Sequence, residues 1–93
     1  MKAYRFLVSG KVQGVFYRKS IKQMASLGQI QGYIRNLASG DVEVVAYLWE
    51  DQINDMLAIL QNGSPMSEVE NISYEEVELD EDEIVYDGFE IRK

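Results

Sequence analysis

Apolar and polar residues alternate in several short segments of the chain, which is the pattern of half-buried β-strands. Residues 42–48 show it most clearly, because the side chains at every second position, Val42, Val44, Ala46 and Leu48, are all apolar. The same period predicts further strands at 3–9, 30–36 and 72–79, and a short closing strand at 88–91.

Two other segments have apolar residues at helical spacing. The first follows the loop at Gly14, and Gly28 stands where a C′ glycine would end it. The second has apolar positions at 53, 56, 57 and 60, with Asp51 as its predicted N-cap and Asn62-Gly63 at its end. Both helices are therefore amphipathic, and each is expected to pack one face against the sheet.

The predicted order of elements is β-α-β-β-α-β, and right-handed crossovers would fold it into a ferredoxin-like split βαβ. The expected fold class is α+β, with an antiparallel sheet covered on one face by two helices. The glutamate-rich segment 72–79 suits an exposed edge strand. A chain of 93 residues predicts a single domain over residues 1–93. This architecture serves enzymes, RNA binders and regulatory modules alike, so fold alone does not give the function.

Charge is distributed unevenly along the chain. Residues 1–40 contain seven Lys or Arg and no acid, whereas residues 41–93 contain all sixteen acids, and the net charge is −7. An acidic protein is a poor candidate for nucleic-acid binding, which depends on neutralising phosphates. The basic first part can attract a small anion, or it can pair in space with the acidic part.

The chain has no cysteine and no histidine. Disulfides, thiolate chemistry, histidine bases and the usual zinc ligands are therefore excluded. Arg5 interrupts the first apolar run, so we expect no signal peptide. No apolar stretch approaches the ~20 residues that span a bilayer. We expect a cytoplasmic protein that does not associate with membranes.

The segment between the first strand and the first helix is a candidate anion site. Gly14 can adopt a positive φ, which lets successive amides point inward, and the helix that follows presents its N-terminal N–H groups. Arg18 falls in the first turn of that helix, where the helix dipole disfavours a cation unless an anion is bound. Loops of this kind are common, so composition and spacing alone leave a structural role open.

Two motifs make the candidate more specific. The string Val12-Gln13-Gly14-Val15-Phe16-Tyr17-Arg18 resembles the signature of the acylphosphatase family, and Gly32 to Asn36 resembles a second segment of that family. Later pieces are also similar, and the resemblance runs in order from about Tyr4 to Ile91. These later pieces are Gly40-Asp41-Val42-Glu43, Gly63-Ser64-Pro65 and Phe89-Glu90-Ile91.

The resemblance implies an enzyme that hydrolyses the carboxyl–phosphate bond of small acyl phosphates. Arg18 would be the catalytic arginine that binds phosphate, and Asn36 would position the attacking water. It implies no cofactor and no metal. We expect a small-molecule acyl phosphate substrate, no nucleic-acid partner and a monomer. The implied phosphate-binding residues are Gln13, Gly14, Val15, Phe16, Tyr17 and Arg18.

Other interpretations stay open from the residues alone. An asparagine at a strand end, such as Asn36, is usually a turn residue. A non-catalytic ferredoxin-like module that binds a phosphorylated ligand or a protein would keep Arg18, and an RNA-recognition module is disfavoured by the acidic charge. The chain departs from the family pattern at Ile21, Leu37 and Leu48-Trp49, which puts the rate of turnover in question but not the fold.

Overall fold

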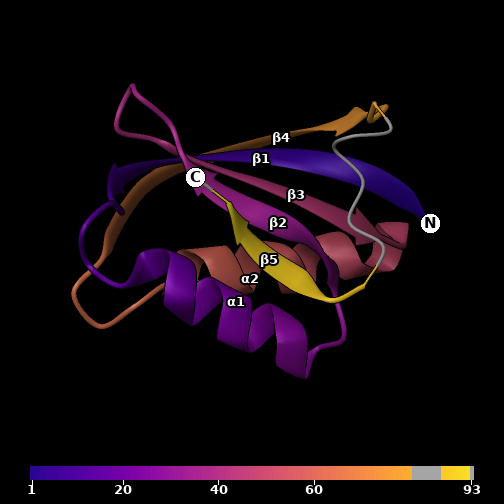
Figure 1. Ribbon diagram of the computed structural model, residues 1–93, viewed down its shortest axis with the longest axis horizontal. Helices are drawn as coiled ribbons and strands as arrows, with labels where there is room; N and C mark the ends of the chain where they lie inside the picture. The colour runs from indigo at the N-terminus through magenta and orange to yellow at the C-terminus, as the bar shows by residue number, and fades with distance from the viewer. Residues whose placement is uncertain (81–86, 93) are drawn as a thin grey trace.

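The structure is a computed structural model that describes residues 1–80 and 87–92. In the described part of the chain, no helix is long and apolar enough to cross a membrane. A 3₁₀ turn over Glu50–Gln52 precedes the second helix. The elements, in chain order, are β1 (Lys2–Lys11), α1 (Tyr17–Leu27), β2 (Gln31–Asn36), β3 (Val42–Leu48), α2 (Ile53–Asn62), β4 (Glu68–Val77) and β5 (Phe89–Arg92) (Figure 1).

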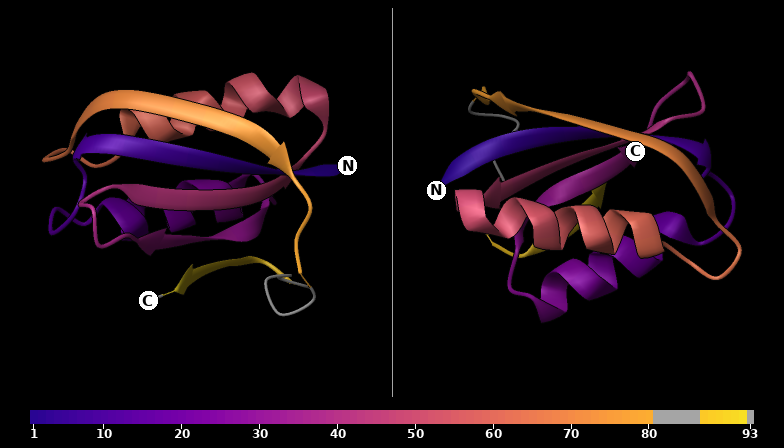
Figure 2. Two further views of the ribbon diagram at one scale, coloured as in Figure 1. Left: turned by 90° about the horizontal axis from the view of Figure 1, so that it is seen from above. Right: turned by 180° about the vertical axis from the view of Figure 1, so that it is seen from behind.

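The strands form one sheet in the order β4-β1-β3-β2-β5, and both helices lie against the same face of it (Figure 2). This confirms the predicted α+β ferredoxin-like fold and places the acidic strand β4 at an edge. The prediction of an antiparallel sheet holds for β4, β1, β3 and β2. It is wrong for the closing strand, because β5 runs parallel to β2. Strands β2 and β5 both run opposite to β4, so β5 lies parallel to β2 at the edge of the sheet.

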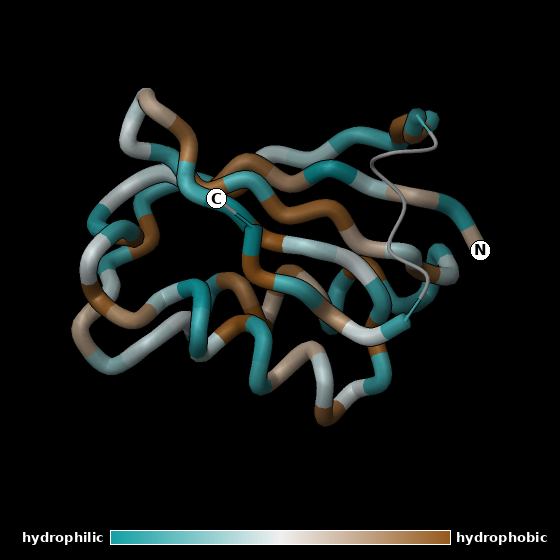
Figure 3. Tube along the Cα trace, viewed as in Figure 1, coloured by the Kyte–Doolittle hydropathy of each residue, from teal (hydrophilic) through white to brown (hydrophobic). Residues whose placement is uncertain are grey.

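The core lies between the sheet and the helices. Alternate residues of a strand face it. Figure 3 shows the bands of hydrophobic and hydrophilic residues along the chain. Ile21 and Ala25 of α1 and Met56 and Leu60 of α2 complete it, all fully buried. Burial of each large side chain stabilises the fold by about 1.5–3 kcal/mol. The strand residues that are fully buried on this face include Phe6, Val8, Ile34, Val42, Val44, Ala46 and Leu48.

The predicted end of the first helix is confirmed, and the predicted N-cap of the second is wrong. Helix α1 ends at Gly28, but Gly28 has φ −83°, and the left-handed residue is Gln29, with φ 57°. This later reversal lets Ile30 enter the core while its amide bonds to the Ala25 carbonyl at 2.9 Å. Asp51 is not the N-cap of α2, because it lies inside the 3₁₀ turn. There the Gln52 side-chain oxygen accepts from the amide of Trp49 at 2.8 Å.

The face of the sheet away from the helices carries a buried carboxylate. Glu43 of β3 is 5% exposed, forms an ion pair with Arg5 on β1 at 3.0 Å and accepts a hydrogen bond from Arg35 on β2 at 2.7 Å. The two arginines come from the strands on either side of β3, so the ion pairs link three adjacent strands. Removing one charge from such a buried group leaves its partners without compensation.

We predict that Glu43→Gln lowers the free energy of unfolding by about 1–3 kcal/mol, because the amide keeps the shape but loses the charge that both arginines face. Urea denaturation followed by circular dichroism measures the change. The control is Glu78→Gln, an exposed glutamate just beyond β4, which should shift the midpoint little. Equal midpoints for Glu43→Gln and wild type would contradict the role assigned to this ion network.

Candidate active site

The loop that joins β1 to α1 has an unusual backbone. Gly14 has φ 71° and Phe16 has φ 61°, so both lie in the left-handed region, which a non-glycine residue such as Phe16 rarely occupies. Val12 and Val15 are buried and anchor the loop, whereas the Phe16 side chain is 72% exposed. Strain of this kind persists only where surrounding contacts hold it, and it is frequent at functional sites.

Among the described residues, the amides of this loop find no backbone partner. In the part of the chain that the structure describes, none of the amides from Gln13 to Lys19 donates to a backbone carbonyl. Those from Tyr17 onward belong to the first turn of α1, where helix geometry leaves amides unpaired. No side chain caps this end of the helix. The loop and the helix end therefore present a set of N–H donors that a bound anion can accept from.

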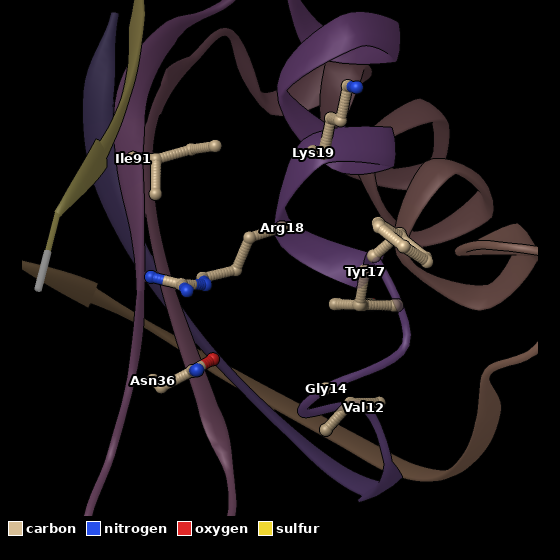
Figure 4. A pocket seen from close by; sticks show the side chains of 8 residues that line it. Val12, Gly14, Tyr17, Arg18, Lys19, Asn36 and Ile91 are labelled. Carbon is tan, nitrogen blue, oxygen red and sulfur yellow. The ribbon is translucent and has the colours of Figure 1, made fainter.

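Arg18 projects from the first turn of α1 toward β2 (Figure 4). Its Nη1 donates to the backbone carbonyl of Arg92, the last residue of β5, at 3.2 Å. This contact steadies the guanidinium between the helix and the sheet. The remaining N–H groups of the guanidinium can donate to two oxygens of one bound anion.

Asn36 is the last residue of β2, and its side chain lies opposite the guanidinium of Arg18 (Figure 4). Its Oδ1 is buried and accepts no hydrogen bond from any residue that the structure describes. An unsatisfied buried acceptor costs about 1–3 kcal/mol. The side chain is therefore positioned to accept from a donor in the space beside it.

The site is a cavity of about 310 Å³. It brings together five of the residues predicted from the sequence and adds three that the sequence analysis did not assign to it. The predicted ones are Gly14, Phe16, Tyr17, Arg18 and Asn36, and the added ones are Val12, Lys19 and Ile91. In the described residues no cluster of carboxylate side chains could hold a metal ion.

Gln13 and Val15, also predicted, do not line the cavity with their side chains. Gln13 Nε2 donates to the carbonyls of Leu37 and Asp41, both at 2.9 Å. Those two residues flank the β2–β3 turn directly after Asn36. Gln13 thereby connects the loop to the end of β2 that carries Asn36. Leu37 takes part in this connection through its backbone carbonyl, which does not depend on the identity of its side chain.

A second support comes from the turn after α2. Ser64 is buried, and its Oγ donates to the carbonyl of Val15 at 2.6 Å. The Tyr17 hydroxyl donates to the carbonyl of Leu60 at 2.6 Å. Burial raises the pKa of Tyr17, so this phenol stays protonated near neutral pH and is not an acid–base group of the site. Ser64 belongs to the segment Gly63-Ser64-Pro65, which resembles the family, but no pattern in the sequence assigns it this role.

Comparison with known proteins agrees with the fold and with the motifs. The family model described as acylphosphatase matches residues 4–91. An acylphosphatase of Coxiella burnetii (strain RSA 493 / Nine Mile phase I) is 40% identical over 85 residues, which is 91% of this chain and 85% of the relative. The crystal structure of acylphosphatase from Bacillus subtilis superposes with a TM-score of 0.85 at 32% identity, over 100% of both chains. The structure of an acylphosphatase from Coxiella burnetii gives 0.83 at 37% identity, over 98% of this chain and 92% of that one. The chain belongs to the acylphosphatase family, a family of hydrolases.

Proposed function

We propose that this enzyme hydrolyses the carboxyl–phosphate bond of small acyl phosphates, giving a carboxylate and inorganic phosphate. Family and fold support the activity. The observation that carries the proposed site is that Arg18, the unpaired loop amides and the free acceptor of Asn36 all border one cavity.

The phosphoryl group of the substrate binds in the loop. The amides from Gln13 to Lys19 donate to its oxygens, and the positive end of the α1 dipole favours its charge. Arg18 donates hydrogen bonds to two phosphoryl oxygens from the side opposite the loop. These donors are in place before the substrate arrives, so little reorganisation is needed when charge shifts in the transition state.

The attacking water is held by Asn36. Its Oδ1 accepts a hydrogen bond from the water and so turns an oxygen lone pair toward phosphorus, because an amide can orient water but cannot act as a base near neutral pH. The P–O bond to the acyl oxygen breaks as the new P–O bond forms. The proton of the water passes to a phosphate oxygen of the substrate.

The leaving group explains how a cavity whose described lining holds no histidine, cysteine or carboxylate can carry out the hydrolysis. It departs as a carboxylate, whose conjugate acid has a pKa of about 4–5 if it resembles Asp and Glu, so it needs no proton. The chain has no histidine or cysteine, and Tyr17 is kept protonated by burial. A phosphate ester, whose alkoxide leaving group does need a proton, would be a poor substrate.

We predict that Arg18→Ala lowers kcat/KM for benzoyl phosphate by about a thousand-fold, the size seen when an arginine on a transferring phosphoryl group is lost. Arg18→Lys keeps the positive charge but loses the bidentate guanidinium, so its kcat/KM should lie between those of Arg18→Ala and the wild type. Asn36→Ala should lower kcat about a hundred-fold with a smaller change in KM, because water positioning acts in the chemical step. Steady-state kinetics measures all three.

The matched control is Asn54→Ala, an exposed asparagine on α2 that lies outside the cavity. It should retain wild-type kinetics. If the wild type has no activity while phosphate still raises its melting temperature, the cavity is a binding site and the hydrolytic proposal is wrong. Wild-type kinetics in Asn36→Ala would remove only the role of Asn36.

We predict that Gln13→Ala lowers kcat about tenfold and leaves the melting temperature within a few degrees of wild type, because it releases the loop from the Asn36 strand end without opening the core. Gln61→Ala, an exposed glutamine on α2, is the control and should behave as wild type. Kinetics and calorimetry on the same samples separate the two effects. Full activity in Gln13→Ala would contradict its positioning role.

A further inference from the structure

A second hollow of about 570 Å³ opens beside the catalytic cavity, between α1 and β5. The two share Lys19 and Ile91, so they form one continuous surface. The other described residues that line it are Lys22, Gln23 and Ser26, which follow Lys19 along one face of α1 at helical spacing. Figure 4 shows Lys19 and Ile91 on the side of Arg18 away from Gly14.

This hollow is positively charged. Lys19 and Lys22 are exposed, and in the described part of the chain neither forms an ion pair and no carboxylate lines the hollow. Ile91 is 41% exposed and supplies an apolar wall. A ligand that fits both features has an apolar middle and an anionic end.

The placement of these lysines is unfavourable for the helix itself. Arg18, Lys19 and Lys22 fall in the first two turns of α1, near the positive end of the dipole, with no acid in the first turn. Arg18 and Lys22 are four residues apart and Lys19 and Lys22 three, so like charges are neighbours. Lysines that only keep the surface soluble would be better placed elsewhere on the helix, whereas an anion reaching from the loop into the hollow would offset the repulsion.

We propose that this hollow, Lys19 to Ser26 with Ile91, is the acyl subsite and that Lys19 and Lys22 select acyl phosphates whose acyl group carries a second negative charge. The proposal rests on the proposed function, since the loop must hold the phosphoryl end. The acyl chain then leaves the cavity past Ile91, and its distal carboxylate lies between the two ammonium groups. The bond that breaks is unchanged, and the lysines act on substrate choice.

The test compares benzoyl phosphate with 4-carboxybenzoyl phosphate, which differ by one rigid distal carboxylate. The readout is the ratio of their kcat/KM values, charged over neutral. We expect the double variant Lys19→Gln/Lys22→Gln to lower this ratio by about tenfold. Each lost interaction between an exposed lysine and the distal carboxylate of the substrate accounts for about threefold. High salt should lower the wild-type ratio in the same direction, because exposed charges are screened.

Lys2→Gln is the matched control. It removes the same charge at the far end of the sheet, where Lys2 pairs with the exposed Glu76 at 3.2 Å, and should leave the ratio unchanged. Hydrolysis of both substrates by the wild type with the same ratio in the double variant overturns the acyl subsite but leaves the proposed function intact. Hydrolysis of neither substrate by the wild type overturns both.

Discussion

The site depends on a run of backbone amides that the fold leaves without partners. If the loop amides donated to the loop's own carbonyls, they could not donate to an anion. A loop whose amides form no such hydrogen bonds must be held in place by other contacts. Here the holding contacts are side-chain bonds to carbonyls: Gln13 to the β2–β3 turn, Ser64 to Val15 and Tyr17 to Leu60. They keep the carbonyls occupied and the N–H groups available. The strained backbone at Phe16 is maintained by the same anchors.

These contacts also show that several elements of the fold hold the loop and its neighbouring side chains in position. Ser64 and Leu60 belong to the end of α2 and the turn after it, Asn36 to β2, and the carbonyl that holds Arg18 to β5. Four segments far apart in the sequence therefore meet at one end of the sheet. Core packing brings them there, so the precision of the site and the stability of the core are linked.

Much of the fold could be predicted from the sequence, because alternation and helical spacing record which face of each element is buried. The parallel pairing of β5 could not, since a short strand carries no mark of its direction. Asp51 was misplaced because capping propensity does not reveal a 3₁₀ turn held by Gln52. In the site, Arg18 and Asn36 were found through their motifs, and the structure brings both to one cavity. The bonds of Gln13 and Ser64 join distant residues, so no local pattern could predict them.

The most direct test of this account is an amide NMR titration of the ¹⁵N-labelled wild type with inorganic phosphate. The account predicts saturable shifts that are largest for the amides from Gln13 to Lys19, and a loss of these shifts in Arg18→Ala with the rest of the spectrum preserved. Weak shifts spread over the basic surface, with the loop amides no different from others, would contradict the central claim that these unpaired amides form the phosphate site.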